Sequence, residues 1–348
     1  MSNIEWTNAT WNPLVGCTPV SPGCLNCYAA TMAPRLAAMG QQQYVGLTVK
    51  KVTQAGPKKL ATRQVFNGTV RTLPERLTEP LHWRAPRMVF VNSMSDLFHE
   101  SVPFEFVDKV FAVMALCPQH TFQVLTKRPE RMAKYLARPL HPTMGCAIRE
   151  IVGTTALSVW AMGRTEEAVS RFDELGGALS NVWLGTSVED QPRFDERVKH
   201  LKDCVAAVRF LSVEPMLGPI DMHDAFYRAR LGPEDPYKRR NSLENWWIIV
   251  GGESGNNARP CNVGWVRSIV QQCKAADVPV FVKQLGSMVH CRNDHVSAWL
   301  DEVGMGLDYM DTSETRMQGD PVRVMLNSRK GGDPSEWPED LRVREFPR

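Results

Sequence analysis

Short, continuous apolar runs recur along the chain, and they constrain its fold more than any other feature. Six of them occupy residues 87–92, 121–126, 181–187, 207–213, 245–252 and 278–284. Continuous rather than alternating hydrophobicity is typical of parallel strands that are covered on both faces. A further short strand is expected just before Cys17. The runs therefore predict the strands of one parallel sheet.

Segments with helical spacing of apolar residues lie between these runs. The clearest are FEFVDKVFAVMALC at 104–117 and VGWVRSIVQQCKAAD at 263–277. Strands that alternate with helices predict βαβ units with right-handed crossovers. The sequence thus predicts an α/β fold in which a full or partial parallel (β/α) barrel carries the structure.

Three stretches interrupt this alternation, and the end of the chain departs from it. The interruptions are a basic stretch at 41–75, a partly helical stretch at 139–180 and a charged, proline-containing stretch at 222–244. The last forty or so residues are rich in turn formers. Since 348 residues suit one barrel with insertions, we expect a single domain over 1–304 and an irregular extension over 305–348 packed on it.

Charge is distributed unevenly along the chain. Residues 6–74 contain no Asp or Glu, whereas seven Lys or Arg side chains lie between Arg35 and Arg71. Aromatic side chains at Tyr44, Phe66 and Trp83 are interleaved with or follow this basic segment. Cations with aromatics suit a phosphate backbone and stacked bases, so the segment predicts a nucleic acid or nucleotide partner. A solvated basic loop is the alternative interpretation.

The sequence shows no sign of membrane association or export. No apolar run approaches the length of a membrane-spanning helix. The first residues lack the basic and apolar regions of a secretory signal. We therefore expect a cytoplasmic protein in a reducing compartment, where the nine cysteines do not form a disulfide scaffold.

Polar side chains follow each of the six apolar runs. In parallel α/β folds, active sites gather at the carboxyl ends of the strands. Because every run ends in this way, we expect a functional site there. Single members could instead cap helices or form ion pairs. The candidates are Ser93, Ser95, Asp96, His99, Lys127, Arg128, Ser187, Glu189, Glu214, Glu253, Ser254, Lys283 and Gln284.

Two alternatives concern particular members of this set. Ser95 and Asp96 are suitable helix caps, and Lys127 and Lys283 could simply pair with neighbouring glutamates. The GGESG segment at 251–255 lacks the spacing of a dinucleotide-binding loop. Its glycines would nevertheless allow the backbone to approach a ligand closely.

Three cysteines near the N-terminus form the most specific motif. Cys17, Cys24 and Cys27 have the spacing C-x6-C-x2-C. A structural zinc site needs four ligands, and no second cysteine pair follows, so a fourth would come from a distant residue such as His99 or His290. Three thiolates without a fourth suit a [4Fe-4S] cluster with one open iron. The spacing therefore favours a cluster over zinc or unligated thiols.

A three-cysteine loop before a parallel barrel resembles the radical S-adenosylmethionine superfamily. The usual spacing there is C-x3-C-x2-C with an aromatic residue before the last cysteine, whereas here six residues intervene and Asn26 holds that place. The chain more closely resembles the phage Gp37/Gp68 family, which is related to radical S-adenosylmethionine enzymes and distantly similar to spore photoproduct lyase. Asn8 departs from the Asp expected in that family. The blocks that carry the resemblance are IEWTNATWNPLVGCTPVSPGCLNCYA, VNSMSDLFHE, LTKRPERM, WLGTSVED, RFLSVEPMLGPID, WWIIVGGESGNNARPC, VPVFVKQLG and the closing WPEDLRVREFP.

The resemblance implies cofactors and roles for the strand-end residues. It implies that the three cysteines hold a [4Fe-4S] cluster whose open iron binds S-adenosylmethionine. Ser93, Ser95 and Asp96 would then contact the methionine amino group of S-adenosylmethionine. Ser187 and Glu189 would lie near its ribose or carboxylate.

Further roles follow from the same resemblance. Glu214 and Glu253 become candidates for binding ribose, adenine or substrate. Lys127 and Lys283 would neutralise the methionine carboxylate or a substrate phosphate. Spore photoproduct lyase uses a cysteine as hydrogen donor, and Cys261 is the best-placed analogue in this sequence.

The hypothesis is a radical S-adenosylmethionine enzyme that acts on a nucleic acid, a nucleotide or another anionic substrate. Such an enzyme would need a reductant protein such as a flavodoxin or ferredoxin. One alternative is a non-catalytic nucleic-acid-binding protein with a structural or redox-sensing cluster. Another is a zinc-stabilised hydrolase that uses the glutamates and lysines at the strand ends.

Overall fold

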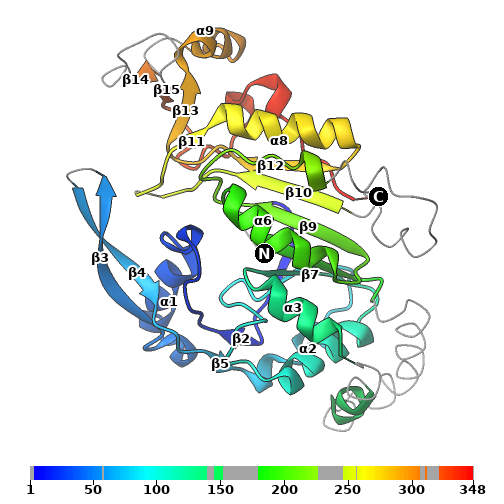
Figure 1. The fold of residues 1–348 in the computed structure, drawn as a ribbon. Coiled ribbons are helices and arrows are strands. Elements are labelled where there is room, and N and C mark those ends of the chain that lie inside the picture. The colour runs from blue at the N-terminus through cyan, green and yellow to red at the C-terminus, as the bar shows by residue number, and fades with distance from the viewer. Residues whose placement is uncertain are drawn as a thin grey trace. The chain divides into compact units, whose positions relative to one another are not determined.

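The computed structural model describes residues 4–56, 59–138, 145–151, 179–225, 246–255, 257–305, 310–311 and 321–347. Its main sheet has seven strands in the order β1-β6-β7-β8-β9-β10-β12 (Figure 1). The bounds are Ala9–Trp11 for β1, Met88–Val91 for β6, Thr121–Thr126 for β7, Val182–Ser187 for β8, Val208–Val213 for β9, Trp246–Gly251 for β10 and Val280–Gln284 for β12. Every predicted apolar run lies on one of these strands, so the predicted strands are confirmed.

The strand pairing supports the predicted fold class. The pairs β1–β6, β6–β7, β7–β8 and β10–β12 are parallel. The order follows the chain without reversing, which is typical of barrels, whereas doubly wound sheets reverse at a switch point. Among the described residues the order ends at β1 and β12 without closing. The fold is thus mixed α/β and consistent with a partial parallel barrel.

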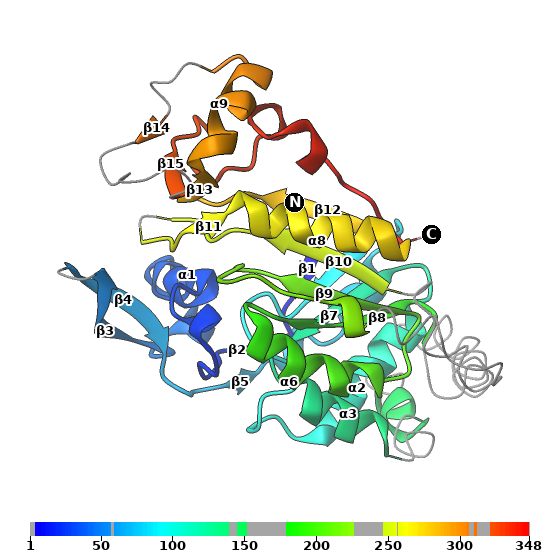
Figure 2. The same cartoon turned by 45° about the horizontal axis from the view of Figure 1, so that its top comes forward.

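The two predicted helices are also confirmed. Helix α2 spans Phe104–Leu116 and α8 spans Val263–Ala276. The backbone N–H of Gly264 donates to the side chain of Asn262 at the start of α8, and Asp277 ends it in the left-handed conformation. Helix α8 runs along β10 and β12 (Figure 2). Further helices are α1 at Tyr28–Ala38, α3 at Pro129–Leu136, α6 at Gln191–Lys202 and α9 at Asn293–Glu302.

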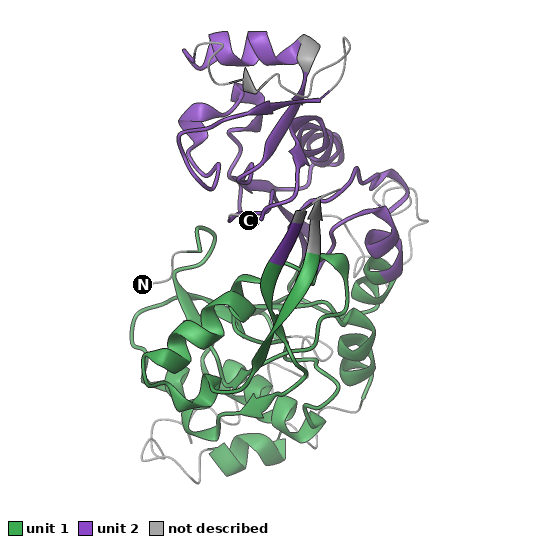
Figure 3. Cartoon of the chain, turned by 90° about the vertical axis from the view of Figure 1, so that its left-hand side faces the viewer, with its two compact units in different colours: residues 1–53, 62–186, 197–209 green, residues 54–61, 187–196, 210–348 purple. Residues whose placement is uncertain are grey.

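The chain divides into two compact units (Figure 3). Unit 1 contains residues 1–53, 62–186 and 197–209, and unit 2 contains residues 54–61, 187–196 and 210–348. The predicted boundary at residue 304 stays a prediction. The predicted insertions at 139–180 and 222–244 lie mostly outside the described residues.

The predicted basic insertion at 41–75 is folded. It contains the 3-10 turn Gln42–Tyr44, a two-stranded sheet of β3 (Thr48–Gly56) and β4 (Lys59–Phe66), and β5 (Arg71–Thr72). Strand β5 pairs antiparallel with β2 (Leu14–Val15), which leads directly to the cysteines. The insertion is therefore built into the start of the chain.

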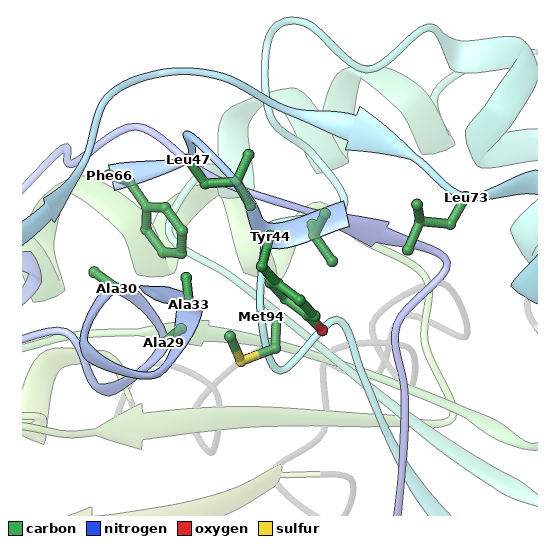
Figure 4. Packing of buried hydrophobic residues seen from close by; sticks show 9 residues of the cluster. Ala29, Ala30, Ala33, Tyr44, Leu47, Phe66, Leu73 and Met94 are labelled. Atoms are coloured by element: carbon green, nitrogen blue, oxygen red, sulfur yellow. The ribbon is translucent and has the colours of Figure 1, made fainter. Parts of the chain in front are cut away.

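The expectation that aromatic side chains of this insertion stack on bases is wrong for two of them. Tyr44 and Phe66 are buried and pack with Leu47 and Leu73 against α1 (Figure 4). The insertion is long enough to need a core of its own, and these rings supply it. Trp83 is half-buried, with the guanidinium of Arg87 over its ring.

The C-terminal extension covers one edge of the main sheet. The N–H of Val282 donates to the carbonyl of Val343 at 2.9 Å, and the N–H of Glu345 donates to Val280 at 3.0 Å. These bonds place residues 343–345 antiparallel to β12. Within 305–348 the structure also has β14 at Met310–Asp311 and β15 at Pro321–Val324. They belong to a four-stranded sheet in the order β11-β13-β15-β14, in which β11 is Cys261–Asn262 and β13 is Val289–Arg292. The extension is therefore partly regular.

None of the helices in the described part of the chain combines the length and apolar character that crossing a bilayer requires.

Candidate functional site

The three cysteines lie in one loop of unit 1, between β2 and α1. Gly16 opens the loop with a φ of +92°, and a β-carbon there would lie 2.0 Å from the carbonyl oxygen of Thr69. Only glycine fits both conditions. Cys24 ends a 3-10 turn, and Cys27 is the N-cap of α1. The local backbone thus fixes the position from which each cysteine side chain extends.

The three thiols lie close enough to influence one another. Burial raises the pKa of Cys17 to about 12, and the charges of Asp96, Cys27 and Cys24 raise it too. Burial also raises the pKa of Cys27, and Cys24 adds to that rise. In the absence of a bound cation, Cys17 and Cys27 are therefore held protonated. Metal binding at this loop would release their protons.

Two cations oppose these effects. The guanidinium of Arg128 lies 3.8 Å from the sulfur of Cys17 and lowers the pKa of Cys17. Lys127 lowers the pKa of Cys27. Both follow β7, whose carboxyl end therefore faces the cysteine loop. Arg128 and Lys127 therefore offset part of the cost that burial places on a negatively charged sulfur.

Arg128 is the centre of a buried hydrogen-bond network. It donates to Asp96 Oδ2 at 3.1 Å, to both oxygens of Glu100 at 2.8 and 2.9 Å, and to the carbonyl of Thr18 at 3.1 Å. These carboxylates raise the pKa of Arg128. One side chain thus connects the cysteine loop to the loops that follow β6 and β7.

Asp96 is fully engaged in the same network. Its Oδ1 accepts from Thr126 Oγ1 at 2.7 Å and from the N–H of Phe98 at 3.0 Å. Its Oδ2 accepts from the N–H of Lys127 at 3.1 Å as well as from Arg128. The structure therefore brings Asp96 to the cysteine loop and uses its acceptors to hold that loop and its turn in place.

The two predicted serines also lie beside the cysteine loop. Ser95 Oγ donates to the carbonyl of Leu14 at 2.8 Å, and Ser93 Oγ donates to Asn12 Oδ1 at 3.2 Å. The hydroxyl of Tyr28 donates to the carbonyl of Ser93. These bonds join the ends of β1, β2 and β6.

His99, considered above as a distant zinc ligand, has both ring nitrogens engaged. Nδ1 accepts from the N–H of Ser101 at 3.1 Å, so Nε2 carries the proton and donates to Thr18 Oγ1 at 2.8 Å. Burial and the charge of Arg128 lower the pKa of His99. Across the part of the chain that the structure describes, no three His, Cys, Asp or Glu side chains are arranged around a single metal ion.

A second group of predicted residues meets in unit 2. Lys283 Nζ lies 3.1 Å from Glu214 Oε1 and donates to Oε2 at 3.3 Å. Ser212 Oγ also donates to Oε2 at 3.3 Å. Glu214 follows β9 and Lys283 lies near the end of β12, so both occupy the carboxyl ends of strands. The two residues form the ion pair that the sequence left as one alternative.

Glu253 forms a similar ion pair with Arg259, which was not among the predicted residues. Arg259 donates from Nη2 to Oε1 at 2.6 Å, and from Nε and its backbone N–H to Oε2 at 2.9 Å each. This fork of bonds fixes a buried carboxylate within its own loop. Glu253 therefore has a structural role in addition to any contact with a ligand.

The expectation that the GGESG glycines make room for a ligand is wrong at two positions. A β-carbon on Gly252 would lie 2.2 Å from the carbonyl oxygen of Leu285, and one on Gly251 would lie 2.7 Å from Glu214 Oε1. The protein itself fills both spaces. These glycines are needed because β10 and β12 continue into closely packed loops.

Of the remaining predicted residues, Ser187, Glu189 and Cys261 are buried, whereas Gln284 is half-buried and Ser254 is exposed. Ser187 ends β8 and Glu189 lies two residues later. Cys261 begins β11 and is 1% exposed, and burial raises its pKa to about 12. The thiol of Cys261 thus stays protonated, which a hydrogen-atom donor requires, but it is packed inside unit 2.

Sequence reasoning missed the roles of three residues. Arg128 was among the strand-end residues, but nothing in its spacing showed that it joins three loops. Arg259 follows Glu253 by six positions, too far for a local pattern to pair them. Asn92 has a φ of +62°, and both polar atoms of its buried amide lack partners among the described residues. Its place at the end of a predicted strand was the available signal.

Comparison with known proteins identifies the family. Residues 1–321 match one family model, described as a protein of unknown function, DUF5131. No curated protein and no solved structure matches the chain. The matched residues include the cysteine loop of unit 1 and the Glu214–Lys283 pair of unit 2. Because the match covers most of the chain, the protein belongs to the DUF5131 family.

Proposed function

We propose that this protein is a radical S-adenosylmethionine enzyme that acts on a nucleic acid, a nucleotide or another anionic substrate. A [4Fe-4S] cluster would be held by Cys17, Cys24 and Cys27. The observation that carries the proposal is the gathering of three interacting thiols in one loop, with Lys127 and Arg128 beside them.

The donor set fits an iron–sulfur cluster better than a single zinc ion. In a [4Fe-4S] cluster each cysteine ligates a different iron, so the sulfurs need not converge on one point. The described residues offer no convergent single-ion site. His99 is committed to Thr18 and Ser101. Three thiolates also leave one iron open for a small molecule.

The chain's own residues would prepare this site. When bound and reduced, such a cluster supplies one electron for cleavage of S-adenosylmethionine to methionine and a 5′-deoxyadenosyl radical. Arg128 would hold Cys17 and balance the charge of its thiolate, and Lys127 would do the same for Cys27. Ser93 and Ser95 keep the β6 loop beside the thiols.

We propose an anionic substrate because residues 6–74, which contain no Asp or Glu, carry exposed cations. Arg35, Lys50 and Lys51 are exposed, and no carboxylate lies within residues 6–74. Arg63 is buried and donates to Asn26 Oδ1 at 2.6 Å, so it is not part of this surface. The surface attracts anions mainly through charge, because Tyr44 and Phe66 are buried.

The experiment is anaerobic. The protein is reconstituted with iron and sulfide, iron is quantified, the EPR spectrum is recorded after dithionite reduction, and S-adenosylmethionine is added. We expect a reduced-cluster signal that shifts on addition and the formation of 5′-deoxyadenosine. Cys24→Ala should lose the cluster, whereas Cys146→Ala, which changes an exposed cysteine outside the loop, should retain it.

Two results would contradict the proposal. A full iron complement in Cys24→Ala would remove this thiol from the ligand set. A cluster that neither binds nor cleaves S-adenosylmethionine would indicate a structural or redox-sensing role, and the protein would then be a binding protein rather than an enzyme.

A further inference from the structure

Exposed large apolar side chains are concentrated in the part of the chain between Val20 and Leu60. Scattered exposed apolar residues are normal, but a local concentration of them marks an interaction surface. Among the described residues, only Met325 and Phe346 lie outside this part. Those within it are Val20, Tyr28, Met32, Met39, Val45, Val49, Val52 and Leu60.

Helix α1 carries the most regular portion of this surface. Tyr28, Met32, Arg35 and Met39 follow one another at intervals of four, three and four residues. Such spacing places them along one side of the helix, and we call them the α1 stripe. Met39 is 75% exposed and Tyr28 is 54% exposed. The alanines on the opposite side of α1 pack in the hydrophobic cluster (Figure 4).

The composition of the α1 stripe suits a protein partner. Tyr, Met and Arg are enriched in protein interfaces, whereas Lys, Glu and Asp are depleted. Single-stranded nucleic acid is bound by several stacked aromatic platforms, whereas the stripe offers one exposed ring, Tyr28, and Tyr44 and Phe66 are buried. The stripe therefore favours a protein surface over a nucleic acid.

Charge defines that partner further. Arg35 lies within the stripe, Lys50 and Lys51 are exposed on β3, and residues 6–74 contain no carboxylate that would oppose them. An acidic face with an apolar centre is complementary to this surface. A second copy placed on a two-fold axis would bring two cationic stripes together, which like-charge repulsion disfavours.

We propose that the α1 stripe docks an acidic electron-carrier protein, an inference that rests on the proposed function. The stripe begins at Tyr28, immediately after Cys27, which caps α1. The Tyr28 hydroxyl, bonded to the carbonyl of Ser93, holds this end of the stripe beside the β6 loop. A carrier seated on the stripe lies next to the cysteine loop. In the transfer the carrier is oxidised by one electron and the cluster is reduced by one.

The test compares two reductants on the reconstituted protein. Reduced flavodoxin is the acidic protein probe, and dithionite is the small-molecule reductant. The stripe variants are Arg35→Glu and the double change Met32→Ser with Met39→Ser. Arg84→Glu is the matched control, because Arg84 is exposed, lies outside the stripe and undergoes the same change of charge.

We expect flavodoxin-driven reduction of the cluster to fall about tenfold or more in both stripe variants, because docking is lost. It should weaken with salt in the wild type and stay unchanged in Arg84→Glu. Dithionite-driven reduction should be the same in all four proteins. This pattern would distinguish a loss of carrier docking from a change in the cluster itself.

Other outcomes overturn the inference without touching the proposed function. Equal flavodoxin rates in wild type and stripe variants would do so, as would a wild-type cluster that dithionite reduces and flavodoxin does not. Sedimentation tests for a dimer, and a fluorescent single-stranded oligonucleotide tests for nucleic-acid binding. If Arg35→Glu abolishes either one while the flavodoxin rates persist, the stripe binds a second copy or a nucleic acid instead. A wild-type protein that assembles no cluster would contradict the proposed function first.

Discussion

At the scale of single residues, Gly16 decides whether the cysteine loop can form. Its positive φ and the nearby carbonyl of Thr69 exclude any side chain. Gly16→Ala should lower the free energy of unfolding by about 3 kcal/mol and reduce iron incorporation, since strain and overlap add. Gly40→Ala is the control, because Gly40 has a φ of +87° with no atom nearby and should lose only about 1 kcal/mol. Urea unfolding measures both, and equal losses would refute the role of the overlap.

His99 makes stability depend on pH. Its folded pKa lies below the usual value because of burial and the charge of Arg128. The unfolded chain therefore binds a proton more readily than the folded protein. The free energy of unfolding should be highest above a pH of about 6.5, the usual pKa of His in an unfolded chain, and should decline as the pH falls below that value. Wild type and His99→Gln are unfolded in urea at pH 7.5 and 5.5, and the wild type should lose more stability. Equal losses would show that His99 does not contribute to the pH dependence.

The candidate site illustrates how far sequence reasoning extends at this scale. Strand-end position predicted that Asp96 and Lys127 would lie near each other, because parallel strands end at one edge. Position could not predict that the acceptors of Asp96 would be taken by Thr126, Phe98 and Arg128. Hydrogen-bond partners depend on rotamers and loop paths, which a residue pattern does not encode.

At the scale of elements, the strands were predictable because each is a continuous apolar run. The β3–β4 sheet was not, since KKVTQAGPKKLATRQ is polar and carries no strong alternation. Its charge suggested a surface loop, whereas its core residues Tyr44, Leu47 and Phe66 are spaced too far apart to form a local pattern. Tertiary contacts with α1 determine this element.

The C-terminal segment should stabilise the edge of the main sheet. Besides the bonds to Val280 and Val282, the carbonyl of Glu345 accepts from Trp247 Nε1 at 2.8 Å, and Phe346 packs on the Trp247 ring. A chain ended after Arg342 should lose about 3 kcal/mol of unfolding free energy and aggregate through β12. Denaturant unfolding and light scattering would measure these effects.

A shorter truncation provides the control for this element. A chain ended after Phe346 keeps every contact described for the segment and should behave like the wild type. If both truncations are equally stable and soluble, the segment does not protect the edge.

At the scale of the whole molecule, the division into two units separates two kinds of candidate chemistry. Unit 1 holds the cysteine loop and the residues that surround it, whereas unit 2 holds Glu214, Lys283 and Cys261. Ligand binding stabilises the structure that binds and leaves the unfolded chain unaffected. The effect of cluster assembly on each unit can therefore be measured separately.

Hydrogen exchange should locate the cluster. Iron and sulfide reconstitution should slow amide exchange where the loop is hydrogen-bonded, at the amides of Cys24, Leu25 and Thr31 and at Gly68, which donates to the carbonyl of Cys17. Helix α8 in unit 2 is the internal reference and should exchange at the same rate with and without iron. Cys24→Ala treated in the same way should show no change. Equal slowing of amide exchange in α8 would indicate global stabilisation of the protein. No slowing in the cysteine loop would show that the iron binds elsewhere. This one measurement therefore tests both the ligand set and whether cluster assembly stabilises unit 1 alone.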